Sequence, residues 1–140
     1  MKAFDLFLDS GDVKKQIPDR NLSNSLIKDS IKRLEYAKYS SLSNENAKYV
    51  YENVYDSLRE AADSVLFLKG FKSFSHEATI SFLQNFDEFS IGELTEFDRM
   101  RRKRNGMKYY GKSCSIEDVK EAIEFAENIL KKIVLLQKKL

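Results

Sequence analysis

The residues best suited to chemistry in this sequence are a run of six cations that is followed directly by two tyrosines. The cations are Arg99, Arg101, Arg102, Lys103, Arg104 and Lys108. Guanidinium groups fit phosphate oxygens, and the phenol rings of Tyr109 and Tyr110 offer stacking faces and hydroxyl donors. The combination indicates recognition of RNA or a nucleotide. The predicted binding residues are Arg101, Arg104, Asn105, Lys108, Tyr109 and Tyr110.

The basic segment continues an apolar stripe if it is helical. At helical spacing, one face carries Leu94, Phe97, Arg101, Arg104 and Lys108. The side that buries the two apolar residues therefore turns two arginines toward the same core or groove, where an unpaired guanidinium is costly. Such an arginine needs an acidic partner, a phosphate or a wet cleft, and the last two are functional. The alternative is a structural arginine inside the fold, with Arg102 and Lys103 solvated.

An acidic residue in an apolar setting offers one such partner. Glu60 and its neighbour Arg59 lie among Leu58, Ala61 and Ala62. A carboxylate in these surroundings is expected to belong to a buried or half-buried ion pair. We expect Glu60 to pair with an arginine of the basic segment.

The single histidine and the single cysteine give little support for nucleophilic or metal chemistry. His76 stands between Ser75 and Glu77 at an expected helix start, where a capping or surface role is favoured over catalysis. Cys114 lies in a predicted loop, and one histidine in the whole chain gives no support for a Cys/His pair or a His/Cys metal site. No metal or cofactor is expected.

Motifs of common enzyme classes are absent. The sequence has no Gly-rich phosphate loop, no H-E-x-x-H and no G-x-S-x-G. The formal net charge is +2, so affinity for nucleic acid has to come from a local patch and not from a global field.

Apolar residues recur at helical spacing along most of the chain. The expected elements are a short helical piece at 4–8 before Gly11, long helices from Asp19 and from Ala47 to a C-cap at Gly70, a short helix capped by Ser73 or Ser75, a long helix opened by the Ser90/Glu93 capping box, and a last helix capped by Ser115. The basic helix is expected to loosen near Gly106. No segment alternates with a period of two for long enough to predict a strand.

These elements predict an all-α fold, an up-and-down bundle of four long helices with a short additional helix. We divide the chain into an N-terminal lead-in at 1–18, ending at Pro18, and one bundle domain at 19–140. Wide apolar stripes on the first and last long helices leave a face for a second subunit, which favours a homodimer. A single cysteine and the absence of a signal-like or membrane-spanning apolar run favour the cytoplasm and no membrane association.

The basic segment also resembles a family signature. Arg104 to Gly111, RNGMKYYG, is similar to the R-N-x-x-x-H block of HEPN domains, with Tyr109 where the histidine stands. In the alternative register, from Arg102, Met107 takes the histidine position and Tyr109 the tyrosine that often follows it. The stretches Tyr55 to Phe71 and Ser75 to Leu83 also resemble this family, and the likeness spans about residues 20 to 140.

The resemblance implies a bundle of four to five helices, usually a homodimer with the arginine block of each subunit at a shared cleft. Many active members are metal-independent endoribonucleases, often of toxin–antitoxin or defence systems, and some pair with a small nucleotidyltransferase. Arg104 and Asn105 take the motif's arginine and polar positions, whereas its histidine has no counterpart. A phenol with a pKa of about 10 is a poor substitute for imidazole in proton transfer.

Three functions follow as expectations. The first is binding of RNA or a nucleotide in an arginine-lined cleft by a degenerate, non-cleaving ribonuclease. The second is an active endoribonuclease in which Arg104 positions the phosphate and Tyr109 replaces the histidine. The third is a non-catalytic partner subunit of a nucleotidyltransferase, in which Arg101 and Arg104 are structural.

Overall fold

The computed structural model describes all 140 residues, and the chain is mostly helical. Its elements in order are α1 (Phe4–Ser10), β1 (Val13–Lys15), α2 (Arg20–Lys38), α3 (Ala47–Lys69), β2 (Phe71–Ser73), α4 (His76–Phe82), a 3-10 turn η1 (Leu83–Asn85), α5 (Ile91–Tyr110) and α6 (Ile116–Lys139). The six helices and the very small sheet confirm an all-α class. No helix is both long enough and apolar enough to cross a membrane.

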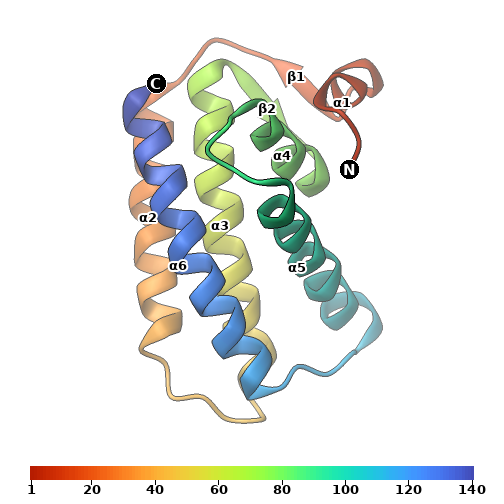
Figure 1. Cartoon of the computed structure of the whole chain (residues 1–140), viewed down its shortest axis with the longest axis vertical. Coiled ribbons are helices and arrows are strands. Elements are labelled where there is room, and N and C mark those ends of the chain that lie inside the picture. The colour runs from red at the N-terminus through yellow and green to blue at the C-terminus, as the bar shows by residue number, and fades with distance from the viewer.

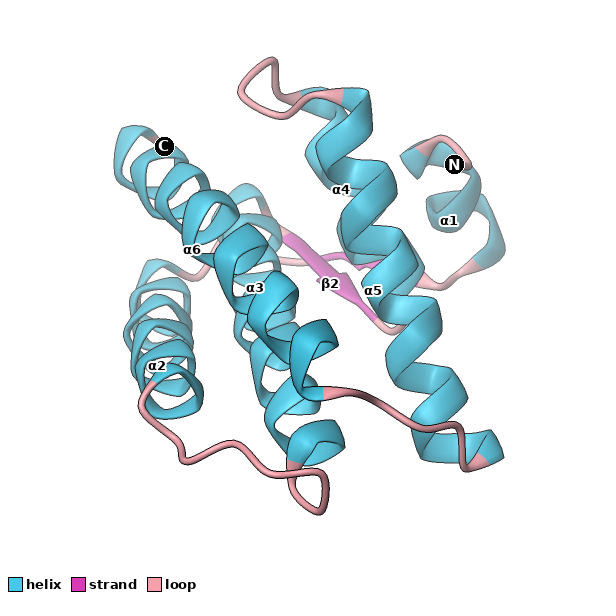
Figure 2. Cartoon of the chain, turned by 60° about the horizontal axis from the view of Figure 1, so that its bottom comes forward, coloured by secondary structure: helices cyan, strands magenta, loops and turns pink.

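Helix α3 is the centre of the fold. It packs against α2 and α6 on one side and against α4 and α5 on the other (Figures 1 and 2). Helices α2, α3 and α6 lie side by side in Figure 1, with α4 and α5 next to α3. Two surfaces of α3 are therefore covered, which accounts for the fourteen buried residues along its length.

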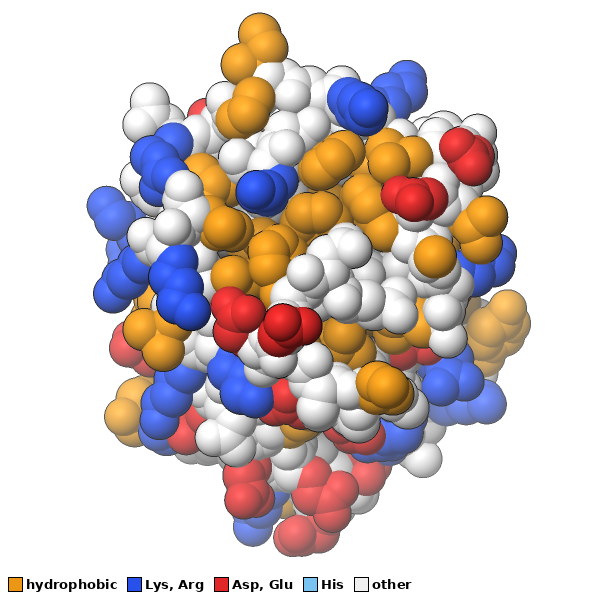
Figure 3. All heavy atoms as spheres, turned by 45° about the horizontal axis from the view of Figure 1, so that its top comes forward, with side chains coloured by type: hydrophobic (Ala, Val, Ile, Leu, Met, Phe, Trp, Pro, Cys, Tyr) orange, Lys and Arg blue, Asp and Glu red, His pale blue; other side chains and the backbone are white.

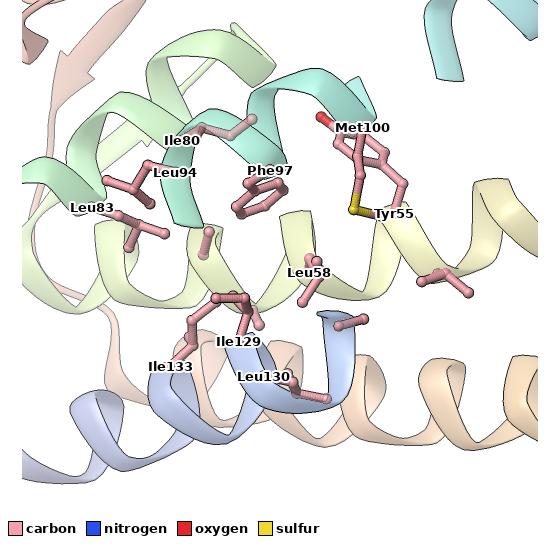
Figure 4. Close-up of a cluster of buried hydrophobic side chains, with 14 of the residues drawn as sticks. Tyr55, Leu58, Ile80, Leu83, Leu94, Phe97, Met100, Ile129, Leu130 and Ile133 are labelled. Carbon is pink, nitrogen blue, oxygen red and sulfur yellow. The ribbon is translucent and has the colours of Figure 1, made fainter. Parts of the chain in front are cut away.

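The core joins side chains from every long helix and from the α4 region. Figure 4 shows Leu58 of α3 below Phe97 of α5 and Tyr55 of α3 beside Met100 of α5, with Ile129 and other residues of α6 on the far side. Phe97 and Tyr55 are 0% exposed, and their ring centroids lie 6.0 Å apart in an edge-to-face arrangement. This contact fixes the rotation of α5 against α3, and so decides which α5 side chains face α3 further along.

Three helices begin at capping residues that the sequence predicts, Ser75, Ser90 and Ser115, and Asp19, the predicted start of a long helix, also acts as a cap. The side chains of Asp19, Ser75, Ser90 and Ser115 each accept a hydrogen bond from the backbone N–H three residues later. The Ser90/Glu93 capping box is present in full, with Glu93 Oε1 2.9 Å from the Ser90 N–H nitrogen. Helix α3 ends at Gly70 in a left-handed conformation, also as predicted.

The C-terminal end of α5 differs from the sequence prediction. The helix does not loosen near Gly106 but continues to Tyr110 and ends at Gly111, whose φ is +65°. Gly106 is buried, and an ideal Cβ at this position lies 3.2 Å from the side chain of Lys112. Because the chain folds back over Gly106, the absence of a side chain makes room for that return, and the helical cost of one glycine is only about 1 kcal/mol.

The prediction that the chain has no strand is also wrong. β1 and β2 form a two-stranded antiparallel sheet, with Val13 opposite Ser73 and Lys15 opposite Phe71. Each strand has only three residues, which is too short for a period of two to be recognised in the sequence.

The first 18 residues pack onto the rest of the chain through this sheet. Phe4, Phe7 and Val13 belong to the main hydrophobic core. The hydroxyl of Ser81 in α4 donates to the carbonyl of Lys2 at 2.7 Å. The N-terminal segment therefore lies along strand β2 and helix α4, with Lys2 at the last turn of α4.

Candidate anion-binding site

Arg104 is the buried cation of the basic segment. It lies on the α5 face that buries Leu94, Phe97 and Met100, and only 8% of its surface is exposed. Its guanidinium carbon lies 5.9 Å from the centroid of the Tyr55 ring on α3. The single side-chain hydrogen bond runs from Nη1 to Oδ1 of the adjacent Asn105, at 3.3 Å. The helical stripe read from the sequence thus places this guanidinium inside the fold.

Arg104 has no acidic partner. Its Nε is buried without a hydrogen bond, and the guanidinium makes no ion pair. Two other arginines have a buried Nε, but each has a carboxylate beside it: Arg33 Nε lies 2.5 Å from Glu60, and Arg59 Nε lies 3.6 Å from Asp56. Arg104 is therefore the one buried guanidinium whose charge no carboxylate balances. Its environment suits an anion from outside the chain.

The neighbouring arginines are held by acidic partners. Arg101 Nε donates to Asp98 Oδ1 at 2.8 Å, and both side chains are 18% exposed. Arg59 Nη1 donates to Asp63 Oδ2 at 3.0 Å, while Asp63 also accepts from the Thr79 hydroxyl at 2.8 Å. In these pairs each carboxylate balances another arginine, so neither of them neutralises the charge of Arg104.

His76, the first residue of α4, lies close to Tyr55 and Arg104. Its Nδ1 lies 3.2 Å from the hydroxyl oxygen of Tyr55, the same tyrosine that packs against Arg104. The helix is capped by Ser75, which leaves the imidazole free to turn toward α3. Burial, together with the charges of Arg59 and Arg104, lowers the pKa of His76 to about 4. The imidazole is therefore neutral at physiological pH.

A cleft of about 480 Å³, lined by Arg101 but not by Arg104 or His76, opens between the N-terminal segment, the start of α4 and the middle of α5. Its lining residues are Met1, Lys2, Glu77, Thr95, Asp98, Arg101 and Arg102. Three cations and two carboxylates face it, so the lining is net positive. A monoanionic group is the best electrostatic match for such a surface.

The other predicted binding residues lie closer to the end of α5. Asn105 is half-buried against Arg104, whereas Lys108 is exposed and Tyr109 and Tyr110 are 64% and 79% exposed. Lys108 Nζ lies 6.0 Å from the Tyr109 ring centroid. The structure therefore brings Asn105 against Arg104, whereas Arg101 pairs with Asp98 and the two tyrosines are exposed at the end of the helix.

The predicted partner of Glu60 is wrong. Glu60 is 6% exposed and pairs with Arg33 of α2, not with an arginine of α5. The reason is the rotation of α3: Glu60 faces α2, whereas Arg59, one residue earlier, lies on the side that contacts α4. Burial raises the pKa of Glu60 to about 7, although the charge of Arg33 opposes the shift.

Sequence reasoning singled out Arg104 but missed the contact between His76 and Tyr55. These residues are 21 positions apart, and the turn at Gly70 with strand β2 brings them together. No local sequence pattern predicts that these two residues are in contact.

In comparisons with known proteins, no family model matches this chain and no curated protein matches its sequence. The described residues contain no group of three or more His, Cys, Asp or Glu side chains placed to hold a metal ion.

Proposed function

We propose that this protein is a HEPN-like helical bundle that binds RNA or a nucleotide through the cleft lined by Arg101 and through Arg104, one turn further along α5, without cleaving it. The observation that carries the proposal is the burial of Arg104 without a carboxylate. A buried charge with no partner costs several kcal/mol in folding. A phosphate oxygen can accept from a guanidinium in the bidentate geometry that Arg104 leaves unused.

The position of Arg104 supports the family part of this proposal. The resemblance places the arginine block on the last-but-one long helix of an up-and-down bundle, and Arg104 lies on α5, the helix before α6. Asn105, the second residue of the block, directly contacts the guanidinium. Binding is preferred to cleavage because Tyr109, which takes the histidine's place in the motif, points away into solvent with no contact to Arg104.

The carboxylate pairs in the cluster restrict the kind of anion. Asp98 and Asp63 already balance Arg101 and Arg59, which leaves Arg104 as the main unbalanced charge. A phosphodiester carries one negative charge, so the backbone of single-stranded RNA fits this balance. The exposed Tyr109 and Tyr110 lie further along the same helix and provide rings on which bases can stack.

The test is the affinity for a fluorescently labelled single-stranded RNA, measured by fluorescence anisotropy over a range of salt concentrations. We expect binding that weakens with salt, because the contact is to phosphate. Arg104→Ala should weaken binding at least about tenfold, the loss expected for one charge-assisted contact. Arg99→Ala is the matched control, since Arg99 lies on the same helix but is 51% exposed and paired with Glu96.

Two results contradict the proposal. One is the absence of RNA or nucleotide binding by the wild-type protein at low salt. The other is equal affinity of the Arg104→Ala and Arg99→Ala variants, provided that both show the circular dichroism of the wild type. Incubation with RNA followed by gel electrophoresis distinguishes binding from cleavage. Cleavage by the wild type that is lost in Tyr109→Phe would support the alternative, an active endoribonuclease.

A further inference from the structure

The only histidine in the chain lies at the edge of the Arg104 site. Tyr55 connects the two residues: its hydroxyl meets His76 Nδ1 at 3.2 Å, and its ring packs against the Arg104 guanidinium. The other ring nitrogen of His76, Nε2, makes no hydrogen bond, and the side chain is half-buried. One polar edge of the imidazole is therefore available to a ligand.

Charged groups face His76 from each element that packs against it. Helix α3 contributes Asp56 and Arg59, and α5 contributes Arg101 and Arg104. On its own helix, Glu77 follows directly and lines the cleft. Burial and three guanidinium groups disfavour the imidazolium, and only Asp56 acts clearly in the other direction. Burial contributes most to the neutral form of His76, and the unbalanced charge of Arg104 adds to this effect.

We infer that His76 is a second anion-binding group of this site, which donates from Nε2 to a phosphate bound at Arg104 and takes up a proton from solvent when the anion binds. This inference rests on the proposed function. The ligand is a phosphate-bearing molecule, either an RNA phosphodiester or the phosphate group of a nucleotide.

We expect His76 to take up a proton because a bound anion reverses the electrostatic effect of the Arg104 site on the imidazole. An anion at Arg104 cancels the repulsion that this guanidinium exerts on a protonated imidazole, and it adds an attraction at short range. In the imidazolium both ring nitrogens donate, so Nδ1–H donates to the Tyr55 oxygen while Nε2–H donates to the phosphate. Burial raises the pKa of Tyr55, which therefore remains a phenol and accepts this hydrogen bond.

A single histidine makes the test direct, because every imidazole signal in the NMR spectrum belongs to His76. The folded protein is titrated between about pH 5 and pH 8, the range in which an unperturbed histidine changes charge. The spectra are recorded alone, with a short single-stranded oligoribonucleotide and with adenosine monophosphate. In the free protein we expect the His76 imidazole to stay neutral over this whole pH range. In the bound protein we expect it to gain a proton within the range. The probe that produces the shift identifies the source of the phosphate.

Variants separate this inference from the function on which it rests. Arg104→Gln should abolish the ligand-induced shift, whereas Arg99→Gln should preserve it. His76→Gln should bind the probe with an affinity that no longer strengthens as the pH falls, while the wild type gains up to about tenfold per pH unit. If a probe binds and His76 stays neutral, or if its shift survives in Arg104→Gln, the inference is wrong and the proposed function stands. If neither probe binds, both are wrong.

Discussion

In the proposed function, the side chain of Arg104 serves binding at the expense of folding stability. Its aliphatic part packs in the core beside Tyr55, but its charge has no internal partner. A structural arginine and a binding arginine respond differently to replacement, because the first loses a native ion pair and the second loses only an unbalanced buried charge. Stability measurements can therefore distinguish the two interpretations of this residue.

We predict that Arg104→Met does not destabilise the protein. Methionine fills a similar volume and removes the desolvated charge, so the free energy of unfolding should stay equal or rise by about 1 kcal/mol. Chemical denaturation in urea measures the change. A loss of about 3 kcal/mol or more would show that the guanidinium is structural. Arg33→Met is the matched comparison, since it leaves the buried Glu60 without its partner and should be clearly destabilising.

The buried carboxyl of Glu60 predicts a pH dependence of stability. Its pKa is about 7 in the folded protein, above the ordinary value of 4.5. Between these values the folded state binds more protons than the unfolded state, so the free energy of unfolding falls as the pH rises from 4.5 toward 7. Glu60→Gln should lack this decline. Urea denaturation of both proteins across that range checks the prediction, and parallel stability curves would contradict it.

At the level of secondary-structure elements, local signals were reliable where a few adjacent residues determine the geometry. The Ser90/Glu93 box and the Gly70 C-cap were predicted because their partners lie within a few positions of one another. The partner of Glu60 and the contact of His76 with Tyr55 depend on the rotation of α3 and the path of the chain after Gly70. Packing between helices decides both, which is why the sequence alone could not assign them.

Helix α5 offers a test of how its start supports the fold. Glu93 caps the helix and also pairs with Lys132 of α6 at 2.7 Å, so one carboxylate joins two elements. We predict that Ser90→Ala costs about 1 kcal/mol of unfolding free energy, the usual value of an N-cap. Glu93→Ala should cost more, because it removes the cap and the contact with α6 together. Thermal unfolding followed by circular dichroism compares them, and equal losses would assign the effect to the cap alone.

On the scale of the whole molecule, apolar surface remains uncovered between α2 and α6. The groove there is lined by Ile31, Leu34, Leu130, Val134 and Leu135, with charged residues along its rim. Leu135 is 59% exposed. Figure 3 shows another view of the surface, on which hydrophobic side chains gather in a patch bordered in part by lysine and arginine. Apolar surface of this kind favours association.

We predict a homodimer that uses the α2–α6 groove. Leu135→Lys places a charge on the exposed part of this groove, so it should shift the protein to the monomer without changing its helical content. Light scattering across micromolar concentrations measures the mass. Tyr110→Lys is a suitable control, since Tyr110 is also exposed but lies at the end of α5. A wild-type protein that is monomeric throughout this range contradicts the prediction.

The turn at Gly70 does not tolerate substitution by a residue with a side chain. An added Cβ there would lie 2.8 Å from the carbonyl oxygen of Gln16, and the backbone φ of +83° already disfavours any other residue. A single methyl group at this position would push the N-terminal layer away from the bundle and displace the following strand. The cleft that Met1 and Lys2 help to line and the orientation of His76 would then be disturbed by a change that touches neither, which makes this glycine a remote point of vulnerability.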